Sequence, residues 1–190
     1  MGQVFKPHNY QKIAIKHVLK NKRAGLFLDM GLGKTVITLT AIDKLMYDRL
    51  EIEKVLIIAP LRVAEDTWSR ETEKWEHLKH LTISKILGNV KERRKALITD
   101  ADIYVINREN VVWLINELSS FGNGWGFDMV VIDELSSFKA SSSKRFKALK
   151  KYITKSNRVL GLTGTPSPNG LIDLWSQVYL IDSGERLGKT

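Results

Sequence analysis

Short apolar runs recur along the chain and are separated by longer amphipathic stretches. Unbroken apolar runs of this length are typical of strands that are buried on both faces. Stretches whose apolar residues recur three and four positions apart are typical of helices that cover such a sheet. The pattern predicts strands at residues 25–28, 55–59, 103–106, 129–132 and 159–162, a weaker strand at 81–87, and helices at 11–20, 34–48, 64–75, 90–98, 108–118, 143–153 and 171–180.

The regular alternation of predicted strands and helices indicates the fold class. Strand and helix in turn favour an α/β fold of three layers, with a mostly parallel central sheet and helices on both faces. A chain of 190 residues is long enough for one such domain with a substantial core. The sequence shows neither an internal repeat nor a low-complexity linker, so we expect residues 1–190 to form a single domain.

Composition narrows the possible chemistry. The chain has no cysteine, which excludes disulfides, thiolate zinc sites and a cysteine nucleophile, and its four histidines follow no metal-ligand spacing. His77 and His80 are three residues apart, and we expect both to be surface polar residues. No apolar run approaches the roughly 18 residues of a membrane helix, and the N-terminus lacks a signal-peptide core, so we expect a soluble, intracellular protein without membrane contact.

The charge balance indicates a polyanionic partner. Lys and Arg number 30 against 21 Asp and Glu, a formal net charge of +9. Eight basic residues and no acidic one lie between Lys139 and Arg158. The predicted helix in this segment places Lys144, Lys147, Lys151 and Lys155 opposite its apolar side. This basic stripe is either a nucleic-acid contact or a solvated face, and the sequence leaves both readings open.

A glycine-rich loop joins the first predicted strand to a helical stretch, and it reads FLDMGLGKT at residues 27–35. Glycines let the backbone approach phosphates closely, and the helix that follows presents free N–H groups to them. Lys34 can reach the β and γ phosphates, and the Thr35 hydroxyl can bind Mg²⁺. The first glycine of the full GxxxxGK[ST] pattern is missing, because Leu28 stands in its place. The loop with its flanking strand and helix predicts a nucleotide site.

An acidic pair follows the apolar run at 129–132. Ligands of open α/β sheets bind at the carboxyl ends of the strands, which is where this run delivers Asp133 and Glu134. Such a pair often only caps a helix, but joined to the phosphate loop it predicts a catalytic role. Asp133 would hold Mg²⁺, and Glu134 would orient and deprotonate the attacking water.

Five ordered motifs together resemble one family. DMGLGKT resembles the DEMGLGKT of Swi/Snf-type DNA translocases, and LTGTPSPNGLIDLW at 162–175 resembles their LTGTPxxNxxxELW. KPHNYQ at 6–11 resembles their RPYQ element, and APLRVAEDTW at 59–68 resembles their APxxxxxxW segment. With the DE pair as the fifth motif, almost the whole chain resembles the N-terminal RecA-like domain of a DExx-box (helicase superfamily two) DNA-dependent ATPase. Its compact form is similar to phage or bacterial members, which implies a cytoplasmic location in a bacterial or phage-infected cell.

The resemblance implies roles for individual residues. Gln11, as the adenine-recognition glutamine, and the phosphate loop would hold ATP. Thr163 and Thr165 would sense the state of the γ-phosphate. Catalysis would rest on Lys34, Asp133 and Glu134, with Mg²⁺ on Thr35 and Asp133. DNA, expected to be duplex and read through phosphates rather than bases, would meet residues in the APxxxxxxW segment and after the strand at 103–106. The implied nucleotide contacts are Gln11, Met30, Gly31, Leu32, Gly33, Lys34 and Thr35, and the implied DNA contacts are Pro60, Leu61, Arg62 and Asn107.

The sequence also departs from the family pattern. Ser136 stands where many members have the histidine that couples hydrolysis to motion, so the coupling in this chain is open. Such motors need a second RecA-like domain, which supplies arginine fingers and does not follow LTGTP here; we therefore expect a monomeric domain that is nearly inactive by itself. The alternatives are another DExx-box DNA or RNA helicase, an accessory subunit of a restriction system, and a nucleotide-regulated DNA-binding module without hydrolysis.

Two tryptophans in the 64–75 helix allow two readings. Trp68 and Trp75 are seven residues apart and would share one helical face. They would serve either as core packing or as platforms for stacked bases, and we expect core packing.

Overall fold

The computed structural model describes residues 2–120, 124–138, 140–164 and 171–188, with side chains described only from residue 174 onward in the last helix. Its centre is a six-stranded sheet in the order β1-β6-β5-β2-β4-β3. Every neighbouring pair of strands is parallel, which confirms the predicted α/β class. The strands are β1 (Arg23–Phe27), β2 (Val55–Ala59), β3 (Ile83–Ile86), β4 (Ile103–Asn107), β5 (Met129–Asp133) and β6 (Arg158–Thr163).

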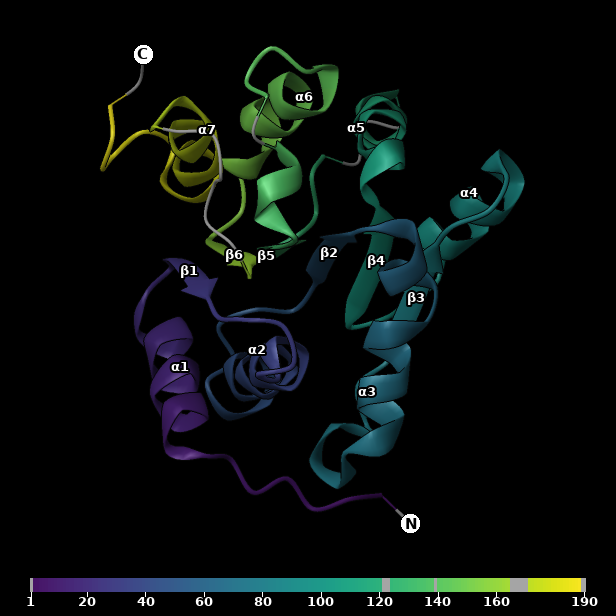
Figure 1. Cartoon of the computed structure of the whole chain (residues 1–190). Coiled ribbons are helices and arrows are strands. Elements are labelled where there is room, and N and C mark those ends of the chain that lie inside the picture. The colour runs from purple at the N-terminus through teal and green to yellow at the C-terminus, as the bar shows by residue number, and fades with distance from the viewer. Residues whose placement is uncertain (1, 121–123, 139, 165–170, 189–190) are drawn as a thin grey trace.

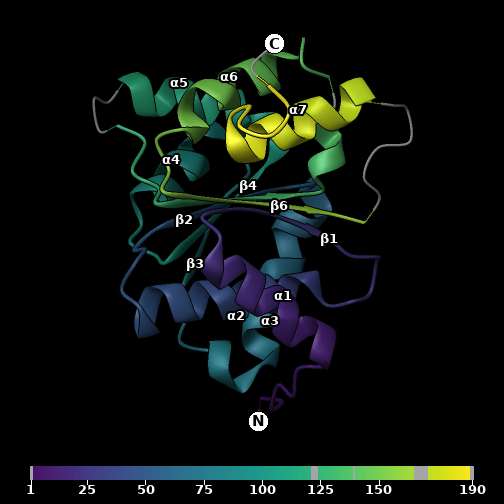
Figure 2. The same cartoon turned by 90° about the vertical axis from the view of Figure 1, so that its left-hand side faces the viewer.

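Helices cover both faces of this sheet. Figure 2 shows α1, α2 and α3 below the sheet and α4 to α7 above it. Figure 1 shows that the N-terminal segment runs along the lower layer, while the last described residues lie in the upper layer beside α7. The helices are α1 (Asn9–Lys20), α2 (Lys34–Asp43), α3 (Trp68–Lys74), α4 (Val90–Ile98), α5 (Val111–Ser120), α6 (Lys144–Ile153) and α7 (Leu171–Asp182).

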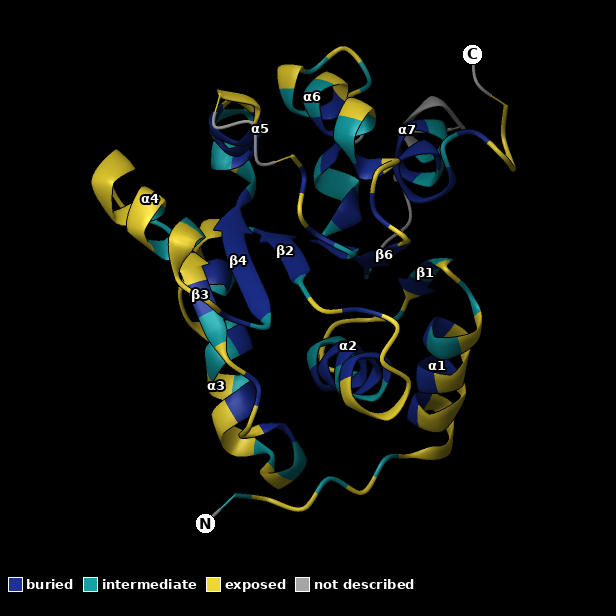
Figure 3. Ribbon diagram, turned by 180° about the vertical axis from the view of Figure 1, so that it is seen from behind, coloured by how far each residue is buried: buried dark blue, intermediate teal, exposed yellow. Residues whose placement is uncertain are grey.

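The apolar runs form strands because both of their faces are buried. All five residues of β2 and of β4 are buried, and alternate residues pack into opposite layers. Ile57 belongs to the core under α1, α2 and α3, whereas its neighbours Leu56 and Ile58 belong to the core under α5, α6 and α7. Figure 3 shows the same contrast, with β2 and β4 fully buried and the outer face of α4 exposed.

Three predicted helices are less regular than the apolar pattern indicates. The predicted helix at 34–48 is α2 followed by the π-helical turn η1 (Lys44–Asp48), and the one at 64–75 begins with the π-helical turn η2 (Val63–Thr67). The predicted helix at 108–118 begins with the 3-10 turn η4 (Arg108–Asn110). Such turns depend on tertiary packing, so hydrophobic spacing alone does not reveal them.

The buried arginine of β6 ties the end of α1 to the sheet. Arg158 is 4% exposed and donates to the carbonyl oxygens of Val18 at 3.0 Å and Leu19 at 3.1 Å. Its guanidinium also donates to Glu51 Oε2 at 2.7 Å, and this bond together with the positive charge lowers the pKa of the Glu51 carboxyl. The charge is therefore buried with partners, as burial of an ion requires.

Candidate nucleotide site

The glycine-rich loop lies between β1 and α2, and its conformation requires glycine at two positions. Gly31 and Gly33 have φ angles of 82° and 78°, in the left-handed region that glycine adopts without strain. A Cβ atom on Gly33 would stand 2.7 Å from Gln11 Nε2, so a side chain there would have to displace the end of the Gln11 side chain. Within the described part of the chain, no side chain caps the first turn of α2, which leaves its N–H groups for an anion.

Lys34 begins α2 and stays close to the loop. Its Nζ donates to the carbonyl oxygens of Leu28 at 2.6 Å and Asp29 at 3.0 Å. The ammonium group therefore lies at the base of the loop, where bound phosphates would lie.

Gln11 in α1 holds the other side of the loop. Its Oε1 accepts from the backbone N–H of His8 at 2.9 Å, and its Nε2 donates to Leu32 O at 3.4 Å. Tyr10 Oη donates to the same carbonyl oxygen at 3.2 Å, and its ring stacks on His8. The glutamine predicted to recognise adenine is thus fixed beside the phosphate loop.

Asp133 ends β5 and faces the same pocket. Burial raises the pKa of its carboxyl to about 6, and the neighbouring Glu134 charge acts in the same direction. The indole N–H of Trp68 and the Lys34 charge oppose this shift of the Asp133 pKa. A carboxylate that is costly to ionise in isolation is suited to a cation, because the cation stabilises the charged form.

Glu134 has a strained backbone and a fixed side chain. Its φ of 61° is unusual for a residue with a Cβ atom and costs on the order of 1–3 kcal/mol. Its Oε1 accepts hydrogen bonds from Ser136 Oγ and from Thr163 Oγ1, the latter at 3.0 Å. Strain that the surrounding structure maintains is typical of functional positions. From the motifs alone, Ser136 is only a departure from the family pattern, and the structure adds its contact with Glu134.

The phosphate loop, Gln11, Asp133 and Glu134 line one pocket of about 850 Å³. Most of the predicted site residues are brought together there, although Leu32 contributes its carbonyl oxygen to Gln11 and Tyr10 rather than a lining side chain. Thr163 reaches the pocket through Glu134, and Thr165 lies outside the described residues. The pocket residues among those predicted are Gln11, Met30, Gly31, Gly33, Lys34, Thr35, Pro60, Asp133 and Glu134.

The donors in this pocket fit magnesium rather than a zinc-type metal. Among the described residues, no three His, Cys, Asp or Glu side chains cluster closely enough to bind a metal by themselves. Mg²⁺ is normally held by one or two protein oxygens together with phosphates and water. Thr35 and Asp133 provide that kind of donor set.

The predicted DNA contacts lie at the same edge of the sheet. Pro60 follows β2, Asn107 ends β4, and Ala59 pairs with Asn107 in the parallel register. Leu61 and Arg62 are exposed. Asn107 is buried, and its amide bonds Glu109 Oε2 and Asn110 Nδ2 at 3.1 and 2.6 Å, so it braces η4 rather than facing solvent.

The predictions for the two tryptophans and for the basic stripe of α6 have different outcomes. Trp68 is fully buried, which confirms core packing, whereas Trp75 is half-buried and lines the nucleotide pocket. In α6 the apolar side is buried and the stripe is exposed, as the helical spacing predicts. The exposed stripe lysines are Lys144, Lys147, Lys151 and Lys155.

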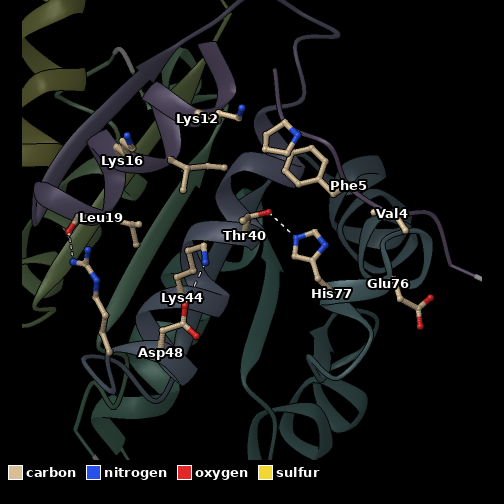
Figure 4. Close-up of a pocket in the computed structure, with 13 residues that line it drawn as sticks. Val4, Phe5, Lys12, Lys16, Leu19, Thr40, Lys44, Asp48, Glu76 and His77 are labelled. Atoms are coloured by element: carbon tan, nitrogen blue, oxygen red, sulfur yellow. Dashed lines mark hydrogen bonds and ion pairs between the residues drawn. The ribbon is translucent and has the colours of Figure 1, made fainter. Parts of the chain in front are cut away.

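A second pocket, of about 730 Å³, lies between the N-terminal segment, α1 and α2. Figure 4 shows Thr40 and His77 facing each other across it, with Phe5 beside the imidazole. His77 is half-buried and lines this pocket, and burial lowers the pKa of its imidazole. His80 is exposed and bonds Asp43 at 2.8 Å. Val4 and Phe5 line both pockets, so the N-terminal segment is their common wall.

An all-parallel sheet with a glycine-lysine loop after β1 and an acidic pair after β5 defines a class: a RecA-like, P-loop nucleotide-binding domain. Comparison with protein families narrows the class. The SNF2-related domain family matches residues 10–185, so the chain belongs to that family and is a SNF2-family ATPase domain. This match confirms the resemblance to Swi/Snf-type ATPases that the sequence motifs indicate.

Individual relatives agree with this assignment. "Putative protein p41" of Acyrthosiphon pisum secondary endosymbiont phage 1 is 44% identical over 99% of this chain, which spans 42% of that protein. The human "DNA excision repair protein ERCC-6-like" is 33% identical over 98% of this chain, which spans 15% of that protein. The chain thus covers less than half the length of these relatives.

Solved structures show the same fold. The Sulfolobus solfataricus SWI2/SNF2 ATPase core, solved in complex with dsDNA, matches 96% of this chain and 38% of its own with a TM-score of 0.76 and 28% identity. The UvsW helicase of bacteriophage T4 has a TM-score of 0.68 over 94% of this chain and 61% of its own, and at 21% identity this likeness concerns the fold alone. No helix in the described part of the chain is both long and apolar enough to cross a membrane.

Proposed function

We propose that this chain is the ATP-binding half of a DNA-dependent translocase. The observation that carries the proposal is the convergence of Gln11, Lys34, Thr35, Asp133 and Glu134 on one pocket. These residues are the set that ATP binding and hydrolysis require: an adenine contact, a phosphate cation, two metal ligands and a base.

The roles follow from the positions of the groups. Lys34 and the N–H groups at the start of α2 bind the phosphates, and Gln11 binds the base edge. Thr35 and Asp133 would hold Mg²⁺, which neutralises charge on the phosphate oxygens. Glu134 orients the attacking water and takes its proton, while Ser136 and Thr163 fix the carboxylate.

Movement on DNA needs a second domain in this proposal. Pro60, Leu61 and Arg62 lie at the sheet edge beside the nucleotide pocket, where a phosphate backbone can approach them, and Asn107 supports that edge. The structural relative bound to dsDNA supports duplex DNA as the partner. Arginine fingers from a second RecA-like domain would add about 10³- to 10⁵-fold in rate, so we expect near-background hydrolysis from residues 1–190 alone.

The test separates binding from hydrolysis. Lys34→Ala should weaken ATP binding to this chain, whereas Glu134→Gln should preserve binding. In the protein that carries the second domain, Glu134→Gln should lose DNA-stimulated phosphate release by orders of magnitude. Turnover by Glu134→Gln equal to that of the parent would remove the general-base role. ATP binding without any turnover in the unsubstituted protein that carries the second domain would indicate a nucleotide-regulated DNA-binding module instead.

A further inference from the structure

Trp68 contacts the carboxylate that faces the nucleotide pocket. Its side chain is fully buried, and its Nε1–H donates to Asp133 Oδ2 at 3.2 Å. The two residues are 65 positions apart, so the contact is made by the tertiary structure. Among the described residues, no other side chain donates a hydrogen bond to Asp133, and its Oδ1 has no side-chain partner.

The segment that carries Trp68 is shaped to deliver it. The chain leaves β2 at Ala59, passes Pro60 and forms the π-helical turn η2, after which Trp68 begins α3. A π-helical turn holds one residue more than an α-helical turn, which rotates the following side chains by about 100° around the axis. The turn thus sets the side on which Trp68 lies, and that side faces Asp133.

Packing alone does not account for the choice of acceptor. A buried indole N–H needs some hydrogen-bond partner. Trp125 is a tryptophan in this chain whose indole bond serves packing only. Trp125 is 4% exposed and donates to Ser156 Oγ at 2.6 Å, remote from the nucleotide pocket. Trp68 instead holds one oxygen of a pocket carboxylate, which orients the group expected to bind the metal.

We propose that Trp68 is a positioning residue for the metal site: its indole fixes Asp133 Oδ2 and thereby directs the carboxylate toward Mg²⁺. This inference rests on the proposed function. It also makes the segment from Pro60 to Trp68 a physical link between the expected DNA contact and the metal carboxylate. A displacement of that segment by DNA would move the donor that orients Asp133.

The experiment measures how much metal the chain needs in order to bind nucleotide. Binding of fluorescent N-methylanthraniloyl-ATP to residues 1–190 is followed while Mg²⁺, and separately Mn²⁺, is titrated. Trp68→Phe keeps most of the ring volume and removes the N–H. Loss of a hydrogen bond to a charged group predicts a rise of about tenfold in the half-maximal metal concentration, with binding recovered at high metal.

Trp125→Phe is the matched control, because it also removes a buried indole hydrogen bond but leaves the pocket unchanged. It should leave the metal requirement at the parent value, even where its melting temperature falls as far as that of Trp68→Phe. If Trp68→Phe does not fold, β-(3-benzothienyl)alanine at position 68 keeps the bicyclic shape without the donor. A purely structural role for Trp68 would leave the metal requirement of either variant unchanged.

A double substitution tests whether Trp68 acts through Asp133. In an Asp133→Ala background, adding Trp68→Phe should raise the metal requirement no further, because the acceptor is already gone. Additive effects, or a parental metal requirement in Trp68→Phe, would overturn the positioning role while leaving the proposed function intact. Failure of the parent chain to bind nucleotide at any metal concentration would instead contradict the proposed function.

Discussion

Removal of the hydroxyl groups that hold Glu134 should slow ATP hydrolysis without weakening ATP binding. Ser136 Oγ and Thr163 Oγ1 both donate to Glu134 Oε1, and neither residue lines the nucleotide pocket. The substitutions are Ser136→Ala and Thr163→Val, which remove each donor and keep much of each side chain's volume.

The two donors share one oxygen, and this determines the size of the effect. A hydrogen bond to a charged group contributes about 1.5–3 kcal/mol, and about 1.4 kcal/mol of barrier is tenfold in rate. Either single substitution leaves one donor in place, so we expect kcat to fall by about tenfold or less. The double substitution frees a carboxylate whose backbone is strained, and we expect kcat to fall by about 10²-fold.

The assay is steady-state phosphate release by the protein that carries the second domain, together with direct ATP binding to each variant. Ser137→Ala is the matched control, because Ser137 Oγ is buried and has no hydrogen-bond partner among the described residues. Its kcat should equal that of the parent. If the double variant of Ser136 and Thr163 turns over at the parental rate, the hydroxyls do not position the base and the reasoning is refuted.

Two further predictions concern stability and DNA. Arg158→Met should lower the free energy of unfolding by about 1–3 kcal/mol in a urea titration, because it leaves three carbonyl oxygens at the end of α1 without their side-chain donor, while the exposed Glu51 carboxylate keeps Arg49 as a partner. Because the pKa of Glu51 is lowered in the fold, the Glu51 carboxylate stabilises the protein fully above pH 4.5, and this stabilisation is lost as the pH falls through the folded pKa. The stability of Arg158→Met should depend less on pH in this range, and an equal loss of stability in acid would contradict this. Replacement of Lys147 and Lys151 by Gln should reduce the log-log salt slope of duplex DNA binding by about 1.8, and an unchanged slope would identify the stripe as a solvated face.

Most of the fold was predictable because parallel strands are buried on both faces. Runs such as 55–59 and 129–132 had to be strands once helical stretches of adequate length lay between them. The weaker run at 81–87 became only the short edge strand β3, and its alternation of buried and exposed residues explains the weak signal. The π-helical turns were not predictable, because hydrogen bonds within the fold rather than side-chain spacing distinguish them from α-helix.

The site was predictable in its reactive groups but not in their supports. Lys34, Asp133 and Glu134 belong to short motifs in which local backbone chemistry dictates the residue type. Trp68 ends the APxxxxxxW segment and Ser136 departs from the family pattern, but neither signal indicates a hydrogen bond to a carboxylate of the pocket. The contact of Trp68 appears only when the fold brings two residues 65 positions apart within hydrogen-bonding distance, and that of Ser136 joins it to Glu134, two positions earlier, whose backbone is in the left-handed region.

The strand order explains why Thr163 can act on the base at all. In the sequence the phosphate loop follows β1 and the acidic pair follows β5, but in the sheet β6 lies between them. Phe27 pairs with Thr163 on one side of β6, and Asp133 pairs with Leu162 on the other. The end of β6 therefore adjoins both the loop that would hold the phosphates and the carboxylates that would assist hydrolysis of ATP. A hydroxyl at that position, bonded to Glu134, can transmit a shift of the loop to the base through one hydrogen bond, and a valine in its place cannot.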